Sequence, residues 1–564
     1  MRALSEAQRY RWELPIRRDL FELLASGLTT AVLLLAPPRG DHGWLDRWGR
    51  AARKLARRRT LVIVLAALLG PLIRLAILPI APIPEPAIRD EFVHLLVADT
   101  LRHGRLANPP LPLPDFFETI YELQRPTYAA GYPIGTGAFL ALGWILTGHP
   151  WFGVWISMVL CCGSVTWFQY RWNPPLAACA GGLLFSLFFG IGSYWMNGYW
   201  GGAVPAAGGA LALGSLPVFL RTWRIRSAGL MAAGWTLIWF SRPFESLLFG
   251  ILIVAAILVR LARNGRGSTK AVVPRRHQSL AALLLLGLVV TADAAGYCYH
   301  NLRVTGDPWL HPYQLTQRQY GVPQGFVWQK EVPLPEHLNA EQRRIYFWQR
   351  DLFREAWSPM NQLQNLKSLW AFYVGYPLTI PLLLGLLCWR SRKARVLIAI
   401  LAASLVWSSL YWHMVPHYLA PVAAVLLALI MRGFVVLSHW RFQPDGRPVG
   451  ACLAIGLWLA GALAGLHILH PFVLTGRPEP LAPRATVSVK LQATAGMHLV
   501  FIHYAAGDNR DITWVYNGAQ LDGAKVIWAN DLGRERNREL INYLPRRMVW
   551  AVATDEGVLK QYVQ

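Results

Sequence analysis

The chain has 564 residues, 54% of them apolar and only 15% charged, and its formal net charge is +24. The apolar residues are gathered into blocks of about 15 to 22, a pattern that excludes a soluble globular protein and predicts a polytopic membrane protein. Lys and Arg lie in short clusters between these blocks, so the positive charge indicates membrane topology rather than nucleic-acid binding.

The first 59 residues contain thirteen Lys and Arg against six Asp and Glu, and they end in RWGRAARKLARRR. This excess of cations predicts that residues 1–59 are cytoplasmic. The apolar run 20–36 inside this region is followed by the Arg cluster, which a spanning helix would carry across the membrane. We therefore expect an interfacial or half-buried helix at 20–36. The first span is expected at about 61–80, and it opens a multi-spanning domain over residues 60–471.

The next loop, 81–131, has seven acidic and four basic residues. Its charge bias is opposite to that of the N-terminal region, so it fits the outer side of the membrane. It carries Asp90-Glu91, which follow a proline-rich segment and precede FVHLLVADTLRHG. The apolar spacing of that stretch is typical of a short amphipathic helix lying on the bilayer.

Further apolar blocks bring the expected total to about 11–13 transmembrane helices. They lie at 132–148, 151–168, 175–190, 203–220, 228–241, 244–262, 279–300, 368–388, 396–412, 418–437 and 449–470. The basic connectors between them are expected in the cytoplasm, at 221–226, 263–276, 389–395 and 441–447. Four apolar blocks lie between the outer loop 81–131 and the connector at 221. Because these two segments are expected on opposite sides of the membrane, the chain must cross it an odd number of times between them. The Gly-rich block 132–148 is therefore the candidate for a re-entrant or half-length helix.

A second outer loop, 301–367, and the tail 472–564 are expected on the same side as Asp90. The tail contains the apolar stretches HLVFIHY, ITWVYNG, AKVIWAN and MVWAVAT and the helix-like NRELINYLPRR. This pattern predicts a small soluble α/β domain. The predicted fold class is thus an all-α polytopic membrane protein with a small C-terminal soluble α/β domain.

Asp90 is the candidate general base, with Glu91 beside it as a second catalytic candidate. A carboxylate next to an apolar surface gains basicity and can take a proton from a hydroxyl. The alternative is that the pair caps the helix and supplies its first-turn acid. Arg89 is a candidate substrate contact, and His94, one turn after Asp90, could orient the carboxylate or contact a phosphate.

The segment SYWMNGYWGG, residues 193–202, lies at a predicted outer membrane boundary. Its Gly pair lets the backbone come close to a ligand or to a neighbouring helix. Asn197, Tyr199 and Trp200 are candidate substrate contacts, the two aromatic residues by stacking on a sugar. The alternative is that these aromatics belong to the belt found at any membrane interface.

The segment FSRPFES places Arg242 and Glu245 in a tight connection between two predicted spans. Charged residues at that depth are costly unless they pair or bind a ligand. The fork of the Arg242 guanidinium suits the phosphate of a lipid. A structural Arg242–Glu245 pair, or snorkelling of Arg242 to the headgroups, is the alternative.

The segment YWHMVPHYLAP places His413, His417 and Tyr418 at another outer turn. The two His have the spacing of a zinc pair, but Pro416 interrupts the helix that would align them. We therefore expect these side chains to contact a phosphate or a sugar, and no metal ligand is assigned.

The six cysteines show neither CxxC nor Cys/His spacing, so no disulfide framework or structural zinc site is expected. Walker A, GxSxG, HExxH and Rossmann motifs are absent, which disfavours an ATP-driven pump, a serine hydrolase and a zincin.

The position of Asp90-Glu91 after the first span resembles that of the GT-C glycosyltransferases. These multi-spanning enzymes use polyprenyl-phosphate sugars and include protein O-mannosyltransferases and lipid A aminoarabinose transferases. Their first outer loop begins with an Asp-Glu pair, whose Asp is catalytic. The stretches DEFVHLLVADTLRHGRLANP, YWMNGYWGG, RPFES, HYLAP and WVYNGAQLDGAKVIWAND resemble a bacterial branch of this superfamily. Members often have HPP near the end of that loop, where this chain has Tyr132-Pro133, a departure that bears on the acceptor side.

The resemblance implies a GT-C-like fold and an inverting transfer in which Asp90 deprotonates an acceptor hydroxyl. The implied partners are a polyprenyl-phosphate sugar donor, membrane lipids and a glycan, lipid or protein acceptor, with no nucleic acid. No cofactor is assigned, and a divalent metal ion is left open. The implied location is the bacterial inner membrane, with the N-terminus cytoplasmic and the C-terminal domain periplasmic. A transporter or flippase of lipid-linked sugars is the alternative, and a structural or regulatory membrane subunit is a third reading.

Overall fold

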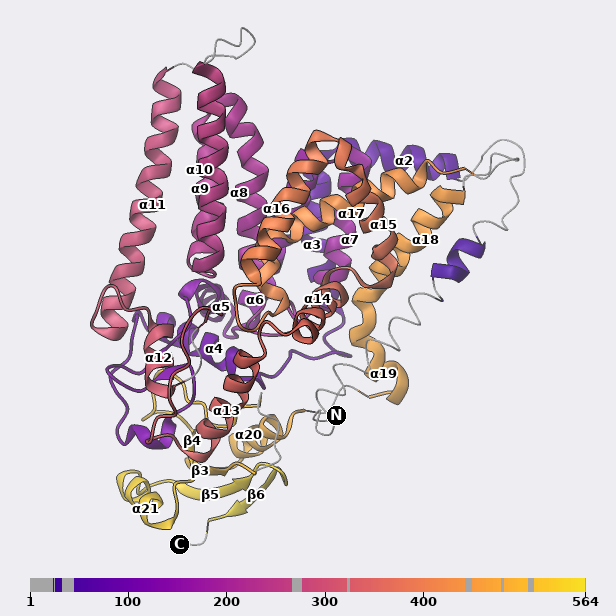
Figure 1. Cartoon of the computed structure of the whole chain (residues 1–564). Helices are drawn as coiled ribbons and strands as arrows, with labels where there is room; N and C mark the ends of the chain where they lie inside the picture. The colour runs from indigo at the N-terminus through magenta and orange to yellow at the C-terminus, as the bar shows by residue number, and fades with distance from the viewer. Residues whose placement is uncertain are drawn as a thin grey trace.

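The computed structural model describes residues 24, 26–32, 45–265, 276–321, 325–441, 449–477, 481–505 and 512–562. A bundle of long helices occupies one end of the molecule, and a small sheet occupies the other (Figure 1). Seven described helices are long and apolar enough to cross a membrane, or up to eight if the bent pair α14 (Pro359–Tyr373) and α15 (Gly375–Leu387) is one span. The predicted class, a helical polytopic membrane protein with a small C-terminal α/β region, is confirmed.

The bundle follows a basic helix, α2 (Leu45–Arg57), and alternates between long and shorter apolar helices. Its members are α3 (Arg59–Ala76), α6 (Trp151–Trp172), α7 (Pro175–Phe189), α8 (Ala203–Thr222), α9 (Ile225–Trp239), α10 (Pro243–Gly265), α11 (Arg276–Thr305), α15, η2 (Cys388–Arg390), α16 (Arg392–Ser408), η3 (Pro416–Val422), α17 (Ala423–Ser438), α18 (Val449–Ala464) and η4 (Gly465–Leu469). The described part of the expected helix at 20–36 is helical and touches α18, where a Cβ on Gly456 would lie 2.2 Å from Thr30.

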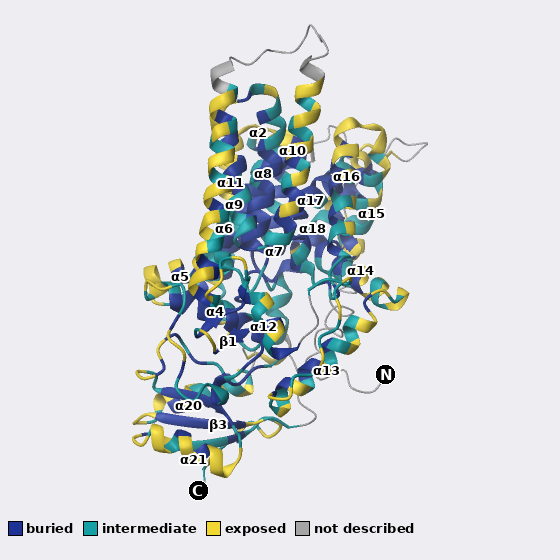
Figure 2. Cartoon of the chain, turned by 60° about the vertical axis from the view of Figure 1, so that its left-hand side comes forward, coloured by how far each residue is buried: buried dark blue, intermediate teal, exposed yellow. Residues whose placement is uncertain are grey.

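Burial within the bundle separates a central group of helices from a peripheral one. The span ending in α17 has 78% of its residues buried, and the span of α11 has only 11% buried. Figure 2 shows the same contrast, with dark blue residues in the centre and exposed yellow residues along α11. Small residues allow the central helices to approach closely. A Cβ on Gly209 of α8 would lie 1.8 Å from the carbonyl oxygen of Pro421, so this glycine brings η3 against α8.

The basic segments lie together at the end of the bundle that is far from the sheet. In Figure 1 that end carries α2, the α8–α9 connection and the η2 turn between α15 and α16. The opposite end carries α4 (Arg89–Arg102), which begins with Arg89-Asp90-Glu91, and α5 (Ile134–Thr147). α5 has 14 residues and packs beside α4. At about 1.5 Å per residue such a helix falls short of a bilayer core of about 30 Å, as expected for the block at 132–148.

The loop between α3 and α5 is compact and mostly irregular. It holds α4, η1 (Pro114–Phe117) and a small hairpin of β1 (Glu122–Leu123) and β2 (Ala129–Ala130). The expectation that α4 lies on the bilayer surface is wrong, because ten of its fourteen residues are buried. α5 covers one side of it, and a segment of the tail covers another.

The tail forms a four-stranded sheet with strand order β4-β3-β5-β6, in which β3 is parallel to both of its neighbours and β6 is antiparallel to β5. Its elements are α19 (His470–Thr475), α20 (Pro483–Ala493), β3 (His498–His503), β4 (Val526–Asn530), α21 (Arg534–Tyr543), β5 (Met548–Ala553) and β6 (Val558–Gln561). Of the four apolar stretches in the tail, ITWVYNG is not part of a strand of this sheet. It lies across α4 instead, because the Thr513 N–H donates to the Ala87 carbonyl at 3.1 Å and the Ala519 N–H donates to Asp99 at 2.7 Å.

The sheet and the two long loops 81–131 and 301–367 share one apolar core. Leu499 and Phe501 of β3 pack in the same cluster as Val93 of α4, Phe117 of η1 and Ile345 of α13 (Ala340–Arg354). α12 (Pro312–Tyr320) of the loop 301–367 contributes Tyr320 to this cluster. The tail therefore fixes the position of α4, whose first turn carries Asp90.

Candidate active site

Glu91 fixes the first turn of α4 to the loop between α7 and α8. Its Oε2 accepts hydrogen bonds from the N–H groups of Ala87 and Ile88 at 2.9 and 3.2 Å, and its Oε1 accepts one from the Tyr199 N–H at 3.1 Å. Burial raises the pKa of this carboxyl, although the three backbone donors oppose that shift. Both oxygens are engaged, so the contacts give Glu91 a structural function beside Asp90.

Asp90 is half-buried and faces a hydroxyl group from another element. The phenol of Tyr132, two residues before α5, donates a hydrogen bond to Asp90 Oδ1. The ring of Tyr132 lies 5.4 Å from the ring of His94, measured between centroids. The site is therefore assembled where the starts of α4 and α5 meet.

Two further tyrosines surround Tyr132. The Tyr121 and Tyr313 ring centroids lie 5.3 and 5.9 Å from that of Tyr132, and 5.5 Å from each other. The Tyr121 hydroxyl also accepts a hydrogen bond from Gln349 at 2.9 Å. Tyr121 has φ +74°, a conformation that costs free energy for a bulky residue. The surrounding contacts hold this ring in place against that strain.

His94 lies on the same face of α4, one turn after Asp90, and is uncharged at neutral pH. Burial and the positive charge of Arg242 lower the pKa of its imidazole to about 3. Its Nδ1 is buried and has no hydrogen-bond partner among the described residues. A neutral imidazole can donate or accept a hydrogen bond without adding charge to the site.

Replacing His94 with glutamine is expected to reduce the acid sensitivity of the fold. The unfolded chain binds a proton at this histidine near pH 6.5 and the folded chain only near pH 3, so stability falls as the pH drops through that window. At pH 5 this histidine costs about 1–2 kcal/mol of unfolding free energy. The thermal midpoint of His94→Gln in detergent should therefore fall less between pH 7 and pH 5 than that of the wild type. Equal falls in both proteins would contradict this assignment.

Arg242 enters the site from the short connection between α9 and α10. Its guanidinium carbon lies 4.5 Å from the centroid of the Tyr418 ring, a cation–π arrangement. Among the residues that the structure describes, no Arg242–Glu245 ion pair of 4.0 Å or less is formed, but the two opposite charges act on each other. Glu245 also accepts a hydrogen bond from the Tyr411 hydroxyl at 3.1 Å. The charge of Arg242 reaches His94, so the guanidinium and α4 belong to one electrostatic site.

His417 lies beside this site within an aromatic group. Its Nδ1 is 3.1 Å from the Tyr194 hydroxyl, and its ring centroid is 4.9 Å from that of Trp200. Tyr418 follows it in sequence and carries the contact to Arg242. His413 lies beside the Trp412 ring at 5.4 Å.

Asn197, Tyr199 and Arg89, which the sequence predicts as substrate contacts, interact with other residues of the protein around the site. Asn197 accepts a hydrogen bond from Arg74 Nε at 2.7 Å and donates to the carbonyls of residues 191 and 193. The Tyr199 hydroxyl donates to the Pro84 carbonyl at 3.0 Å. Arg89 is buried, and its charge acts on Glu122 and Tyr504.

A divalent metal ion is not assigned to this site. The described residues contain no group of three or more His, Cys, Asp and Glu side chains that could hold a metal. Glu91, the nearest carboxylate in sequence, is engaged by three backbone N–H groups.

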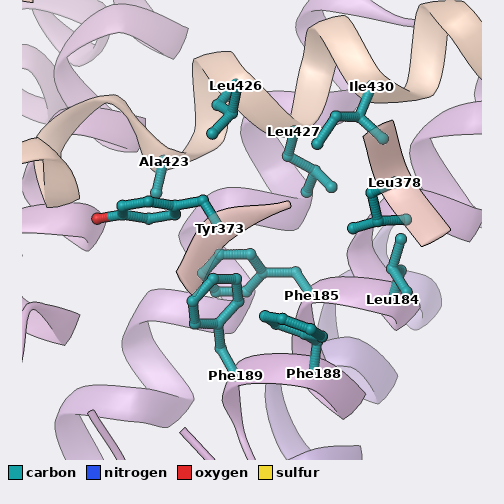
Figure 3. A pocket seen from close by; sticks show the side chains of 10 residues that line it. All are labelled: Leu184, Phe185, Phe188, Phe189, Tyr373, Leu378, Ala423, Leu426, Leu427 and Ile430. Atoms are coloured by element: carbon teal, nitrogen blue, oxygen red, sulfur yellow. The ribbon is translucent and has the colours of Figure 1, made fainter. Parts of the chain in front are cut away.

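A narrow apolar groove lies between α7, α15 and α17 (Figure 3). It is lined by Leu184, Phe185, Phe188, Phe189, Tyr373, Leu378, Ala423, Leu426, Leu427 and Ile430. Figure 3 shows the Tyr373 hydroxyl at the end away from Leu184 and Leu378. That hydroxyl donates to the Pro416 carbonyl at 2.7 Å, next to His417, so one end of the groove adjoins the aromatic group of the site.

No protein-family model matches the sequence, and a search of curated proteins found no match. Similar solved structures include ArnT from Cupriavidus metallidurans bound to undecaprenyl phosphate, with 13% identity and a TM-score of 0.45 over 88% of this chain and 90% of that one. The Archaeoglobus fulgidus oligosaccharyltransferase in the apo form has 12% identity and a TM-score of 0.43, and its complex with Zn and sulfate gives the same values. The match to its apo form covers 78% of this chain and 62% of the oligosaccharyltransferase.

Proposed function

We propose that the protein is a glycosyltransferase that moves a sugar from a polyprenyl-phosphate donor to an acceptor hydroxyl. The observation that carries this proposal is the placement of one carboxylate, Asp90, in a common site with Arg242, which forms no ion pair among the described residues. A general base and a cation for the leaving phosphate are the two groups that such a transfer requires. The neutral His94 and the phenol of Tyr132, which donates to Asp90, are the hydrogen-bonding groups between them.

In this mechanism Asp90 takes the proton of the acceptor hydroxyl as its oxygen forms a bond to the anomeric carbon. The bond between that carbon and the phosphate oxygen breaks on the opposite face, so the configuration inverts. The electron pair leaves with the polyprenyl phosphate. Arg242 stabilises the charge that develops on the phosphate, and its planar guanidinium can donate two parallel hydrogen bonds to it.

The carrier chain is proposed to lie in the apolar groove between α7, α15 and α17. Every residue of the lining except Tyr373 is a hydrocarbon side chain, so an isoprenoid would leave water without losing hydrogen bonds. The polar end of the groove, at Tyr373, adjoins His417. A carrier chain in this groove would therefore bring its phosphate end towards the aromatic group beside Arg242.

The reaction is proposed to occur on the outer face of the bacterial inner membrane. Arg and Lys cluster on α2 and on connections at one end of the bundle, while Asp90 and the sheet lie at the other end (Figure 1). The positive-inside rule then gives a cytoplasmic N-terminus and a periplasmic tail. The glycan, lipid or protein acceptor would approach Asp90 from the periplasm.

Release of polyprenyl phosphate by the purified protein tests this function. Short-chain polyprenyl-phosphate hexoses and aminopentoses would be incubated in detergent with a glycolipid extract of the host envelope, and the free polyprenyl phosphate would be measured. A transferase releases it without any sealed compartment, whereas a flippase leaves every donor intact in detergent and moves it only across a vesicle membrane. The envelope glycolipids of a deletion strain, compared with its parent, would identify the missing sugar.

A further inference from the structure

We propose that Tyr132 is the positioning residue of Asp90, fixing the orientation of the carboxylate and favouring its ionised form. This inference rests on the proposed function, in which Asp90 is the base. The Tyr132 hydroxyl donates to Asp90 Oδ1 across two separate elements of the fold. A hydrogen bond donated to a carboxylate stabilises the ionised state and lowers its pKa, so it keeps the base unprotonated over a wider pH range.

The phenol is suited to remain a donor. Burial and the negative charge of Asp90 raise the pKa of Tyr132 well above its ordinary value, so the hydroxyl keeps its proton throughout the physiological range. The donor and the carboxylate therefore do not exchange roles as the pH changes. Tyr132 can hold Asp90 without competing with it for the proton of the acceptor.

The position of the Tyr132 ring is fixed by its neighbours. It packs against the rings of His94, Tyr121 and Tyr313, which come from three different segments. The preceding residue, Gly131, has no room for a side chain, because a Cβ there would lie 2.9 Å from the Tyr121 carbonyl oxygen and 2.8 Å from Thr316. The Gly131 N–H donates to that same carbonyl at 2.8 Å. A ring fixed in this way can orient its partner to within a few tenths of an ångström, as a catalytic geometry requires.

The pH dependence of Asp90 must be read against the titratable groups around it. Its charge acts on Glu91 of α4, on Tyr121 and Tyr132 in the segment between α4 and α5, on Tyr313 of α12 and on Tyr418 of η3. His94 of α4 and Arg242 between α9 and α10 act on each other in the same site. Of these, Tyr132 donates a hydrogen bond to the Asp90 side chain. Removing its hydroxyl alone leaves the other charges in place.

The test is the pH profile of Tyr132→Phe, which deletes the hydroxyl and keeps the ring. The acid limb of kcat/KM for the donor should move to higher pH by about one to two units, because a hydrogen bond to a charged group is lost. At a pH above the limb, kcat should fall about tenfold with little change in KM, since the carboxylate is less well oriented. The matched control is Tyr121→Phe, which deletes a hydroxyl bonded to Gln349 in the same cluster and should leave the limb in place.

An unmoved acid limb in Tyr132→Phe, or an equal displacement in Tyr121→Phe, would overturn the proposal in favour of packing alone. A second readout does not depend on turnover. The infrared carboxyl band that disappears in Asp90→Asn can be titrated in wild type and in Tyr132→Phe, and the Asp90 pKa should be higher in the variant. If no donor is turned over by any protein, the proposed function fails, while this titration still confirms or refutes the action of Tyr132 on Asp90.

Discussion

Changing Asp90 to asparagine is expected to lower polyprenyl-phosphate release by about 10²- to 10⁴-fold, the usual contribution of a general base. Asparagine keeps the size and the polarity of the side chain but cannot accept a proton from the acceptor. The hydrogen bond from Tyr132 can still be made to the amide oxygen, and Glu91 continues to hold the first turn of α4. Expression, membrane insertion and thermal stability should therefore remain near those of the wild type.

The matched control for this change is Asp115→Asn in the same outer loop. Asp115 lies at the surface, with 49% of its side chain exposed, and pairs with Arg536 at 3.0 Å. Surface ion pairs of this kind contribute little, so activity should be unchanged. Comparable turnover in Asp90→Asn and wild type would remove Asp90 from the mechanism. Equal losses in both variants would indicate that the loop responds to any change of charge.

The sequence predicted which residues lie at the site better than it predicted what each of them does. Asp90, Arg242 and Tyr418 were each expected near an outer membrane boundary, and the structure brings them to one place because α4, the α9–α10 connection and η3 meet at the same end of the bundle. Charged and aromatic residues at such boundaries are conspicuous because the neighbouring spans are so apolar. That these three residues lie close together depends on how the helices pack, which cannot be predicted from a local sequence pattern.

The contacts that fix the site could not be predicted from local patterns. The Tyr199 N–H donates to the Glu91 carboxylate across more than a hundred residues of sequence, and the Arg74 side chain of α3 donates to the Asn197 side chain over a similar separation. Tyr132 stood out only as a departure from a family motif, and nothing in its neighbourhood indicated a bond to Asp90. The burial of α4 depends on segment 512–519, whose apolar alternation is typical of a strand. Its N–H groups instead donate to Ala87 just before α4, to Asp99 within α4 and to the Tyr504 hydroxyl.

Changing Arg242 to glutamine is expected to reduce release of polyprenyl phosphate by about 10²- to 10³-fold, the cost of removing a donor that stabilises a developing anion. Arg242→Lys should recover only part of this loss, because a lysine ammonium keeps the positive charge but is not planar. It therefore cannot stack on the Tyr418 ring or donate two parallel hydrogen bonds to a phosphate. Binding of polyprenyl phosphate, the product of the proposed transfer, should weaken in both variants, which separates this residue from one that acts on the acceptor alone.

Two comparisons decide whether Arg242 acts on the phosphate or only on the fold. The first is Arg171→Gln, which removes a guanidinium that lies 4.9 Å from the centroid of the Trp167 ring at the basic end of the bundle. This cation–π contact is of the same kind as that of Arg242, and its loss should leave both turnover and product binding intact. The double variant Arg242→Gln with Glu245→Gln tests whether Arg242 serves only to balance the charge of Glu245. A buried carboxylate without a nearby cation destabilises the fold, so neutralising Glu245 as well would restore stability if that were the only function of Arg242. Restored turnover in the double variant would therefore assign Arg242 to Glu245, whereas a loss that persists in a stable protein assigns it to the departing phosphate.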